Sequence, residues 1–138
     1  MATVTIRAVE DADQEKVQGL WAACGLSRAS PSEWRSLLSR TTSAMLLAED
    51  GDDVVGTAIA SFDGWRAYIY HVAVDELCRR RGIAFDLIAN AEEYLTGVGA
   101  HEVYVMVTQE NTEGLALVGS QGYLPEGEII LVKPLAPS

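Results

Sequence analysis

The sequence predicts a single α/β domain over residues 1–138, in which helices alternate with the strands of a mixed sheet. Two observations lead to this prediction. Segments with alternating polarity or many β-branched residues recur along the chain, and segments with apolar residues at helical spacing lie between them. The length suits one hydrophobic core, and repeats, low-complexity tracts and long linkers are absent from the sequence.

The expected strands are short and are separated by turn-forming residues. Glu49 to Asp52 would join the second and third strands as a hairpin, and Asp63 with Gly64 would turn the chain into the fourth. The expected strands cover residues 4–9, 44–48, 53–62, 67–74, 102–107 and 129–132. An exposed last strand would offer an edge to a second copy, so a homodimer is a further expectation.

The expected helices begin and end at residues typical of helix termini. Asp11 or Asp13 would cap the first helix and Gly25 would end it, while Pro31 suits the first turn of the second. The expected helices cover residues 11–24, a segment opening at 30–33, residues 82–95 and residues 111–120.

The charge of the chain limits its partners. With 20 acidic and 10 basic residues the net charge is −10, which repels nucleic acid and anionic membranes and favours a cationic small molecule or a basic peptide. Solubility alone is the other explanation. No apolar run approaches the ~20 residues of a membrane span, and no secretory pattern opens the chain, so a cytoplasmic protein is expected.

The sequence gives no pattern typical of a metal site. The two histidines, His71 and His101, stand far apart, and neither a CxxC nor an HExxH pattern occurs. Cys24 and Cys78 are too few for a disulfide framework and are expected to be reduced.

A local positive segment interrupts this acidic chain at residues 79–84. Three consecutive arginines, Arg79 to Arg81, precede Gly82, Ile83 and Ala84, between an expected strand and the clearest expected helix. The first N–H groups of a helix lack intrahelical partners, and small residues let a ligand approach the backbone. This order predicts a pyrophosphate site, although a solvated basic helix start would have the same composition.

The stretch from Ile69 to Leu87 resembles the core motif of the GNAT N-acetyltransferases, Arg/Gln-x-x-Gly-x-Gly/Ala after a strand. Arg79, Gly82 and Ala84 occupy the three signature positions. The stretch from Asn111 to Tyr123 resembles the second motif of the family, with Gly114 where an alanine is usual. The resemblance covers nearly the whole chain and is greatest to small bacterial single-domain members.

The resemblance implies a GNAT fold: a central, mostly antiparallel sheet with splayed fourth and fifth strands, flanked by about four helices. It also implies that acetyl-CoA donates an acetyl group to a primary amine of a small molecule or peptide, by direct attack. The residues implied in acetyl-CoA binding are Val72, Ala73, Val74, Arg79, Arg80, Arg81, Gly82, Ile83, Ala84 and Asn111.

Catalytic residues are expected on the fourth strand. Tyr68 and Tyr70 would share a face, and His71 would face the other side unless a bulge intervenes. Histidine ordinarily titrates near neutral pH, which suits a general base, but a lone strand histidine can equally be structural. Tyr70 could line an acceptor pocket or the core.

The usual catalytic acid of the family is missing. The resemblance places a proton-donating tyrosine where this chain has Val118, and valine has no proton to give. A degenerate module that binds acetyl-CoA and senses or regulates without turnover is therefore a second hypothesis. An unrelated phosphate-binding α/β domain is a third.

The residues around the acceptor also leave alternatives open. The segment from Cys24 to Trp34 lies where the family builds its acceptor wall, so Trp21 and Trp34 would line that wall or belong to the core. Asp63 and Arg66 could reach a substrate or could serve only as turn residues.

Overall fold

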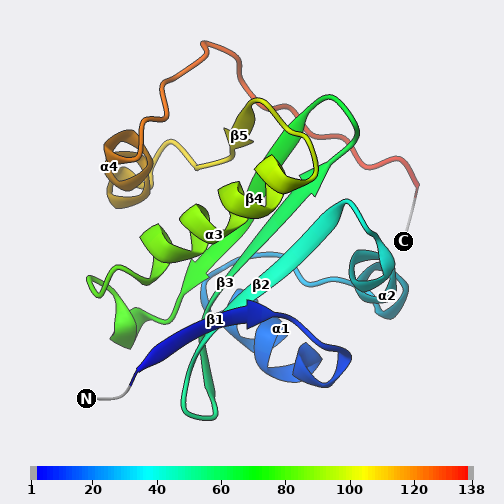
Figure 1. The fold of residues 1–138 in the computed structure, drawn as a ribbon, viewed down its shortest axis with the longest axis vertical. Coiled ribbons are helices and arrows are strands. Elements are labelled where there is room, and N and C mark those ends of the chain that lie inside the picture. The colour runs from blue at the N-terminus through cyan, green and yellow to red at the C-terminus, as the bar shows by residue number, and fades with distance from the viewer. Residues whose placement is uncertain (1–2, 137–138) are drawn as a thin grey trace.

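The computed structural model describes residues 3–136 as a five-stranded sheet with helices on both faces (Figure 1). The strands lie in the order β1-β2-β3-β4-β5, and every neighbouring pair is antiparallel except the parallel pair β4 and β5. They are β1 Val4–Ala8, β2 Ser43–Asp50, β3 Asp53–Phe62, β4 Ala67–Val74 and β5 Val103–Val105. The predicted mixed α/β fold is confirmed.

Four α-helices cover this sheet, two on each face. Residues Met45, Leu47 and Ile59 of the sheet pack against α1 and α2, whereas their neighbours in sequence pack against α3 and α4. The helices are α1 Gln14–Ala23, α2 Pro31–Ser39, α3 Ile83–Gly97 and α4 Thr112–Ser120. Short 3-10 turns at Asp11–Asp13 and Glu76–Cys78 precede α1 and α3.

Local sequence signals fix several helix ends. Ser30 and Glu33 form a reciprocal capping box at the start of α2, where Pro31 is the first helical residue. Gly25 follows α1 with φ +75°, a left-handed conformation that glycine adopts without a Cβ penalty. These ends agree with the sequence predictions.

The predicted strand at residues 129–132 is wrong. This segment forms no strand in the structure, and the exposed fractions of its four side chains lie between 70% and 94%. Its β-branched residues suit a strand, but a strand forms only where a neighbour satisfies its backbone groups, and within residues 3–136 none does. The homodimer expected through this strand stays a prediction.

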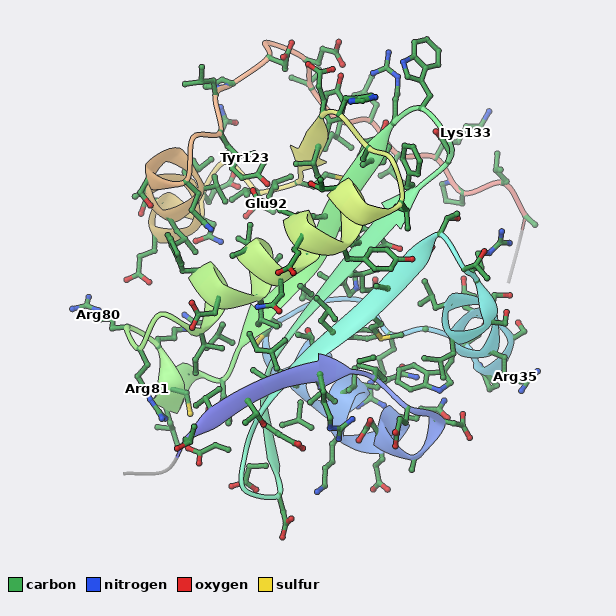
Figure 2. All side chains as sticks on the ribbon, viewed as in Figure 1. Arg35, Arg80, Arg81, Glu92, Tyr123 and Lys133 are labelled. Carbon is green, nitrogen blue, oxygen red and sulfur yellow. The ribbon has the colours of Figure 1, made fainter. Side chains whose placement is uncertain are left out.

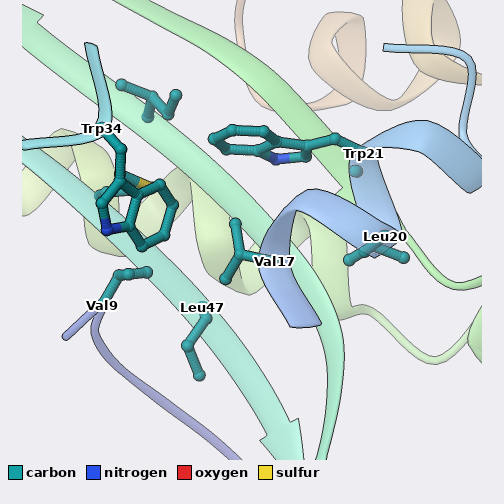
Figure 3. Close-up of a cluster of buried hydrophobic side chains, with 9 residues drawn as sticks. Val9, Val17, Leu20, Trp21, Trp34 and Leu47 are labelled. Carbon is teal, nitrogen blue, oxygen red and sulfur yellow. The ribbon is translucent and has the colours of Figure 1, made fainter. Parts of the chain in front are cut away.

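The core between the sheet and helices α1 and α2 contains two tryptophans (Figure 3). Trp21 and Trp34 are each 1% exposed and meet edge to face, with their ring centroids 6.3 Å apart. Val17 and Leu47 pack beside them. This cluster holds α1 and α2 against the face of β3 and β4 on which the site lies.

Helix α3 lies close to the sheet because Gly56 of β3 has no side chain. A Cβ at this position would lie 2.9 Å from both Ile83 Cγ2 and Leu87 Cδ1, in the first turns of the helix. The glycine therefore sets how near the start of α3 approaches β3.

Gly56→Val is expected to lower the free energy of unfolding by about 1–3 kcal/mol, because overpacking forces side chains and backbone to shift. Chemical denaturation measures the change. Gly19→Ala in α1 is the control, since a Cβ there meets nothing within 4 Å and alanine favours the helix. If the denaturation midpoint of Gly56→Val equalled that of the wild type, α3 would be able to move away from β3 without loss of stability.

Candidate active site

A β-bulge in β4 brings Tyr70 and His71 to the same face of the sheet. Thr57 pairs with Ala73 and Ile59 with Tyr70, so the single residue Ala58 of β3 opposes two residues of β4. His71 has φ +49°, an uncommon conformation for a residue other than glycine. The bulge on which the position of His71 depended is present, and both side chains line one cavity.

The bulge is held by a buried threonine that sequence reasoning missed. The indole N–H of Trp21 donates to Thr57 Oγ1 at 2.9 Å, and the Thr57 hydroxyl donates to the His71 carbonyl at 3.1 Å. Thr57 is fully buried, so each of these hydrogen bonds satisfies a group that water cannot reach. A single polar residue in the apolar run of β3 was the only sequence signal for it.

The imidazole of His71 is oriented by the loop between α1 and α2. Its Nε2 lies 3.0 Å from the Ser27 carbonyl oxygen and 3.3 Å from Ser27 Oγ, and the ring meets Trp21 edge to face. Because a carbonyl oxygen only accepts, the contact with it places the ring proton on Nε2. The lone pair then lies on Nδ1, which is the nitrogen able to take up a proton.

The two tyrosines of β4 lie in different surroundings. Tyr70 is half-buried against the α1 cluster, and burial raises the pKa of its phenol. Tyr68 stacks on Tyr104 of β5, with ring centroids 5.4 Å apart, and lines a neighbouring cavity. The structure thus brings Tyr70 and His71 together and places Tyr68 further along the strand.

The cavity beside Tyr70 and His71 has a volume of about 390 Å³. Its walls are one face of α2, the loop before that helix, and the surface of β3 and β4. The lining residues are Trp21, Ser27, Arg28, Ala29, Ser32, Glu33, Ser36, Leu37, Arg40, Ile59, Tyr70 and His71. Trp21 therefore belongs to a cavity wall, whereas Trp34 is a core residue.

Strands β4 and β5 separate beyond the first residues of β4. β5 pairs with Ala67, Tyr68 and Ile69 only, so within residues 3–136 the later part of β4 has no neighbour on this side. Beyond the bulge, Val72 and Val74 pack toward α3, and Ala73 packs toward α1. The expected separation of the fourth and fifth strands is therefore observed, and it begins beside the bulge.

The turn that leads into α3 exposes a row of backbone donors. Arg80 and Gly82 both have left-handed backbone conformations, with φ +66° and +77°. Within the described part of the chain, the N–H groups of residues 79 to 84 donate to no protein acceptor. Such a turn at a helix N-terminus forms a concavity suited to an anion.

The side chains of this turn leave the concavity open. A Cβ at Gly82 would meet no heavy atom within 4 Å, and Ile83 points into the core. Figure 2 shows Arg80 and Arg81 pointing in different directions. Arg80 lies 3.7 Å from Glu113 and Arg81 lies 3.5 Å from Asp50, both exposed contacts that bind these side chains weakly.

Helix α4 begins near this turn with Asn111 as its cap. The Asn111 side chain accepts a hydrogen bond from the Gly114 N–H at 2.9 Å. A Cβ at Gly114 would lie 2.5 Å from Asn111 Nδ2, so the departure from the usual alanine makes room for this cap. The structure shows Asn111 bonded to its own helix.

Neither Val118 nor Tyr123 is placed to give up a proton. Val118 is buried in the core between α3 and α4. The Tyr123 hydroxyl donates to Glu92 Oε2, and burial together with this carboxylate raises the pKa of the phenol (Figure 2). Tyr123 also packs against the core between α3 and α4.

A family model described as "Acetyltransferase (GNAT) family" matches residues 6–123. The chain is a GNAT acetyltransferase family member. The matched range begins in β1 and ends just after α4, so it includes the bulge, the turn before α3 and the start of α4.

Solved structures with the same fold cover almost all of this GNAT chain. The aminoglycoside N-acetyltransferase AAC(6')-Iy, in complex with a CoA bisubstrate analogue, is 20% identical with a TM-score of 0.82, over 98% of this chain and 100% of that one. A transcriptional regulator from Bacillus halodurans C-125 is 18% identical with a TM-score of 0.83, over 95% and 99%.

A third similar structure is the aminoglycoside acetyltransferase meta-AAC0020, from an uncultured soil metagenomic sample, in complex with trehalose. It is 20% identical with a TM-score of 0.79, and the match covers 97% of each chain. The fold is thus shared by aminoglycoside acetyltransferases and by a transcriptional regulator, so it does not by itself specify the acceptor. None of the helices described within residues 3–136 is long and apolar enough to cross a bilayer.

Proposed function

We propose that this GNAT chain transfers an acetyl group from acetyl-CoA to a primary amine of a small molecule or peptide. One observation carries the proposal: the same strand, β4, lines the cavity at its bulge and then leads into the open turn before α3. The turn suits the anionic end of a donor, and the cavity suits an acceptor. The setting we propose is the cytoplasm.

The residues of the turn fit the pyrophosphate of acetyl-CoA. The unpaired N–H groups from Arg79 to Ala84 would bind its oxygens, with the three arginines supplying charge around them. The unpaired edge of β4 from Val72 to Val74 would receive the extended arm through backbone hydrogen bonds, and Asn111 at the start of α4 would contact that arm. Acetyl-CoA itself supplies the acetyl group, activated as a thioester.

The acceptor amine must lose a proton before it attacks. An alkyl ammonium has a pKa of ~10.4, so reaching the neutral amine at pH 7 costs roughly 4–5 kcal/mol. We assign the removal of that proton to Nδ1 of His71, since Nε2 is held by Ser27. The raised pKa of Tyr70 keeps its phenol neutral, so Tyr70 donates a hydrogen bond rather than acting as the base.

The leaving group needs less assistance. A thiol has an ordinary pKa of ~8.5, so a thiolate can depart or take a proton from water without a protein acid. This accounts for activity with Val118 at the position of the usual tyrosine. The same residue also favours the alternative function, a module that binds acetyl-CoA and regulates without turnover.

Thiol release from acetyl-CoA across a panel of primary amines tests the proposal. We expect micromolar acetyl-CoA binding by calorimetry and an amine-dependent rate of thiol release. If acetyl-CoA binds but no amine raises the rate above background, the regulatory alternative holds. If acetyl-CoA fails to bind, both fail.

A further inference from the structure

In this acidic protein, basic side chains outnumber acidic ones in the lining of the cavities beside β4. Three of its ten basic residues line them: Arg28 and Arg40 at the cavity containing His71, and Arg40 with Arg66 at the adjoining cavity of about 610 Å³. Of the 20 acidic residues, Glu33 and Asp63 alone line either cavity. The lining is therefore net positive in a chain of net charge −10.

Both of these carboxylates accept hydrogen bonds from backbone N–H groups. Glu33 Oε1 accepts from the Ser30 N–H at 2.8 Å in the capping box of α2. Asp63 Oδ1 accepts from the N–H groups of Trp65 and Arg66, each at 2.8 Å. These hydrogen bonds lower the pKa of each carboxyl and hold one of its oxygens against the backbone, so each carboxylate has only its second oxygen left for a substrate.

The arginines, in contrast, have no carboxylate partner in the described part of the chain. Arg28 and Arg40 make no ion pair or side-chain hydrogen bond within residues 3–136. Arg66 donates to the Tyr104 hydroxyl at 3.0 Å and lies over the rings of Trp65 and Tyr104, and its charge acts on the Asp63 carboxylate without a salt bridge between them. Arg40, at the end of α2, belongs to both cavities.

The rest of the cavity suits a small molecule with a polar end and an apolar body. Trp21, Leu37 and Ile59 supply apolar lining, and Ser27, Ser32 and Ser36 supply polar lining. Tyr70 and His71 close the end beside the β4 bulge. An amine placed at His71 would share the cavity with these apolar side chains and with Arg28 and Arg40.

Building on the proposed acetyl transfer, we infer that the acceptor is a primary amine that also carries a carboxylate, such as an amino acid, and that Arg40 binds this carboxylate. A guanidinium binds a carboxylate through paired hydrogen bonds. The net charge of the whole chain favours a cation, but the charges at the site favour a zwitterion. A polyamine would place its additional cations among Arg28, Arg40 and Arg66.

Matched amines with and without a carboxylate test the inference. Lysine is compared with cadaverine, and phenylalanine with 2-phenylethylamine, by kcat/KM for thiol release from acetyl-CoA. We expect the carboxylate to raise kcat/KM about 10-fold or more, as a charge-assisted hydrogen bond does. Equal or higher values for the amines without a carboxylate would overturn the inference.

Arg40, the residue that follows α2, and Arg35 within α2 provide the variant and its matched control. Arg40→Gln is expected to bring the lysine-to-cadaverine ratio close to one, while the KM for acetyl-CoA shows that the donor site is intact. Arg35→Gln should leave the ratio unchanged, because Arg35 is an exposed residue of the same helix that lines neither cavity (Figure 2). A ratio that survives Arg40→Gln would exclude this residue as the anchor.

A binding measurement separates this inference from the proposed function. Lysine and cadaverine are titrated calorimetrically into the protein saturated with CoA. If no amine is acetylated yet lysine binds more tightly than cadaverine, and Arg40→Gln removes the difference, acetyl transfer fails and the carboxylate site stands. If the two bind equally, the carboxylate site fails whatever the turnover.

Discussion

Gly82→Glu should weaken acetyl-CoA binding by roughly 100-fold or more, the equivalent of losing about two charge-assisted hydrogen bonds. The new carboxylate would project into the open space above the N–H groups of residues 79 to 84, where a phosphate of the donor would lie. Calorimetric titration with acetyl-CoA measures the loss, and circular dichroism shows whether the protein remains folded.

The control for this variant is Gly82→Ala. Both substitutions place an L residue at φ +77°, which costs about 1–2 kcal/mol of stability, but only the glutamate adds charge and bulk. We therefore expect both variants to melt at a similarly reduced temperature and Gly82→Ala to keep most of its affinity. Wild-type affinity in Gly82→Glu would refute a pyrophosphate site at this turn.

His71→Asn should lower kcat by about 10²–10⁴, the usual contribution of a general base. Asparagine tolerates the left-handed conformation of this position better than most residues, so the bulge should persist. The affinity for acetyl-CoA should not change, because the proposed donor contacts are backbone groups of Val72 to Val74 and of residues 79 to 84 rather than the His71 side chain.

The pH dependence distinguishes a base from a structural histidine. In the wild type the rate should fall where the imidazole is protonated, since it then accepts no further proton, and should level off above that pH. In His71→Asn the rate should follow the fraction of neutral amine alone and keep rising with pH. His101→Asn is the matched control, because His101 is exposed and lies in neither cavity. A wild-type kcat in His71→Asn would show that His71 is not the base and has only a structural role, through its contacts with Ser27 and Trp21.

Local features of the sequence predicted most of the fold and the turn before α3, which we propose as the donor site. Helix caps such as Ser30 with Glu33, and the order of strand, arginines, glycine and helix around Gly82, depend on residues close together in the chain. The strand predicted at 129–132 was wrong for the same reason, because its apolar residues match the local pattern of a strand. Whether another strand lies beside this segment to pair with it depends on distant parts of the fold.

The acceptor side depends on contacts between distant segments. The β4 bulge results from the register between β3 and β4, and it alone decides that His71 shares a face with Tyr70. Arg28, Arg40 and Arg66 belong to a loop, the end of a helix and a turn, and only the folded sheet gathers their charges. No spacing along the sequence indicates either feature.

The hydrogen bonds that join Trp21, Thr57 and His71 restrict how this protein can evolve. Replacing Thr57 by valine removes both the acceptor of the Trp21 N–H and the hydroxyl that donates to the His71 carbonyl, whereas replacing Trp21 by phenylalanine leaves only one lone pair of Thr57 unused. The second change is the easier first step. Among descendants of this chain, an apolar residue at position 57 is therefore expected only where position 21 has already lost its donor.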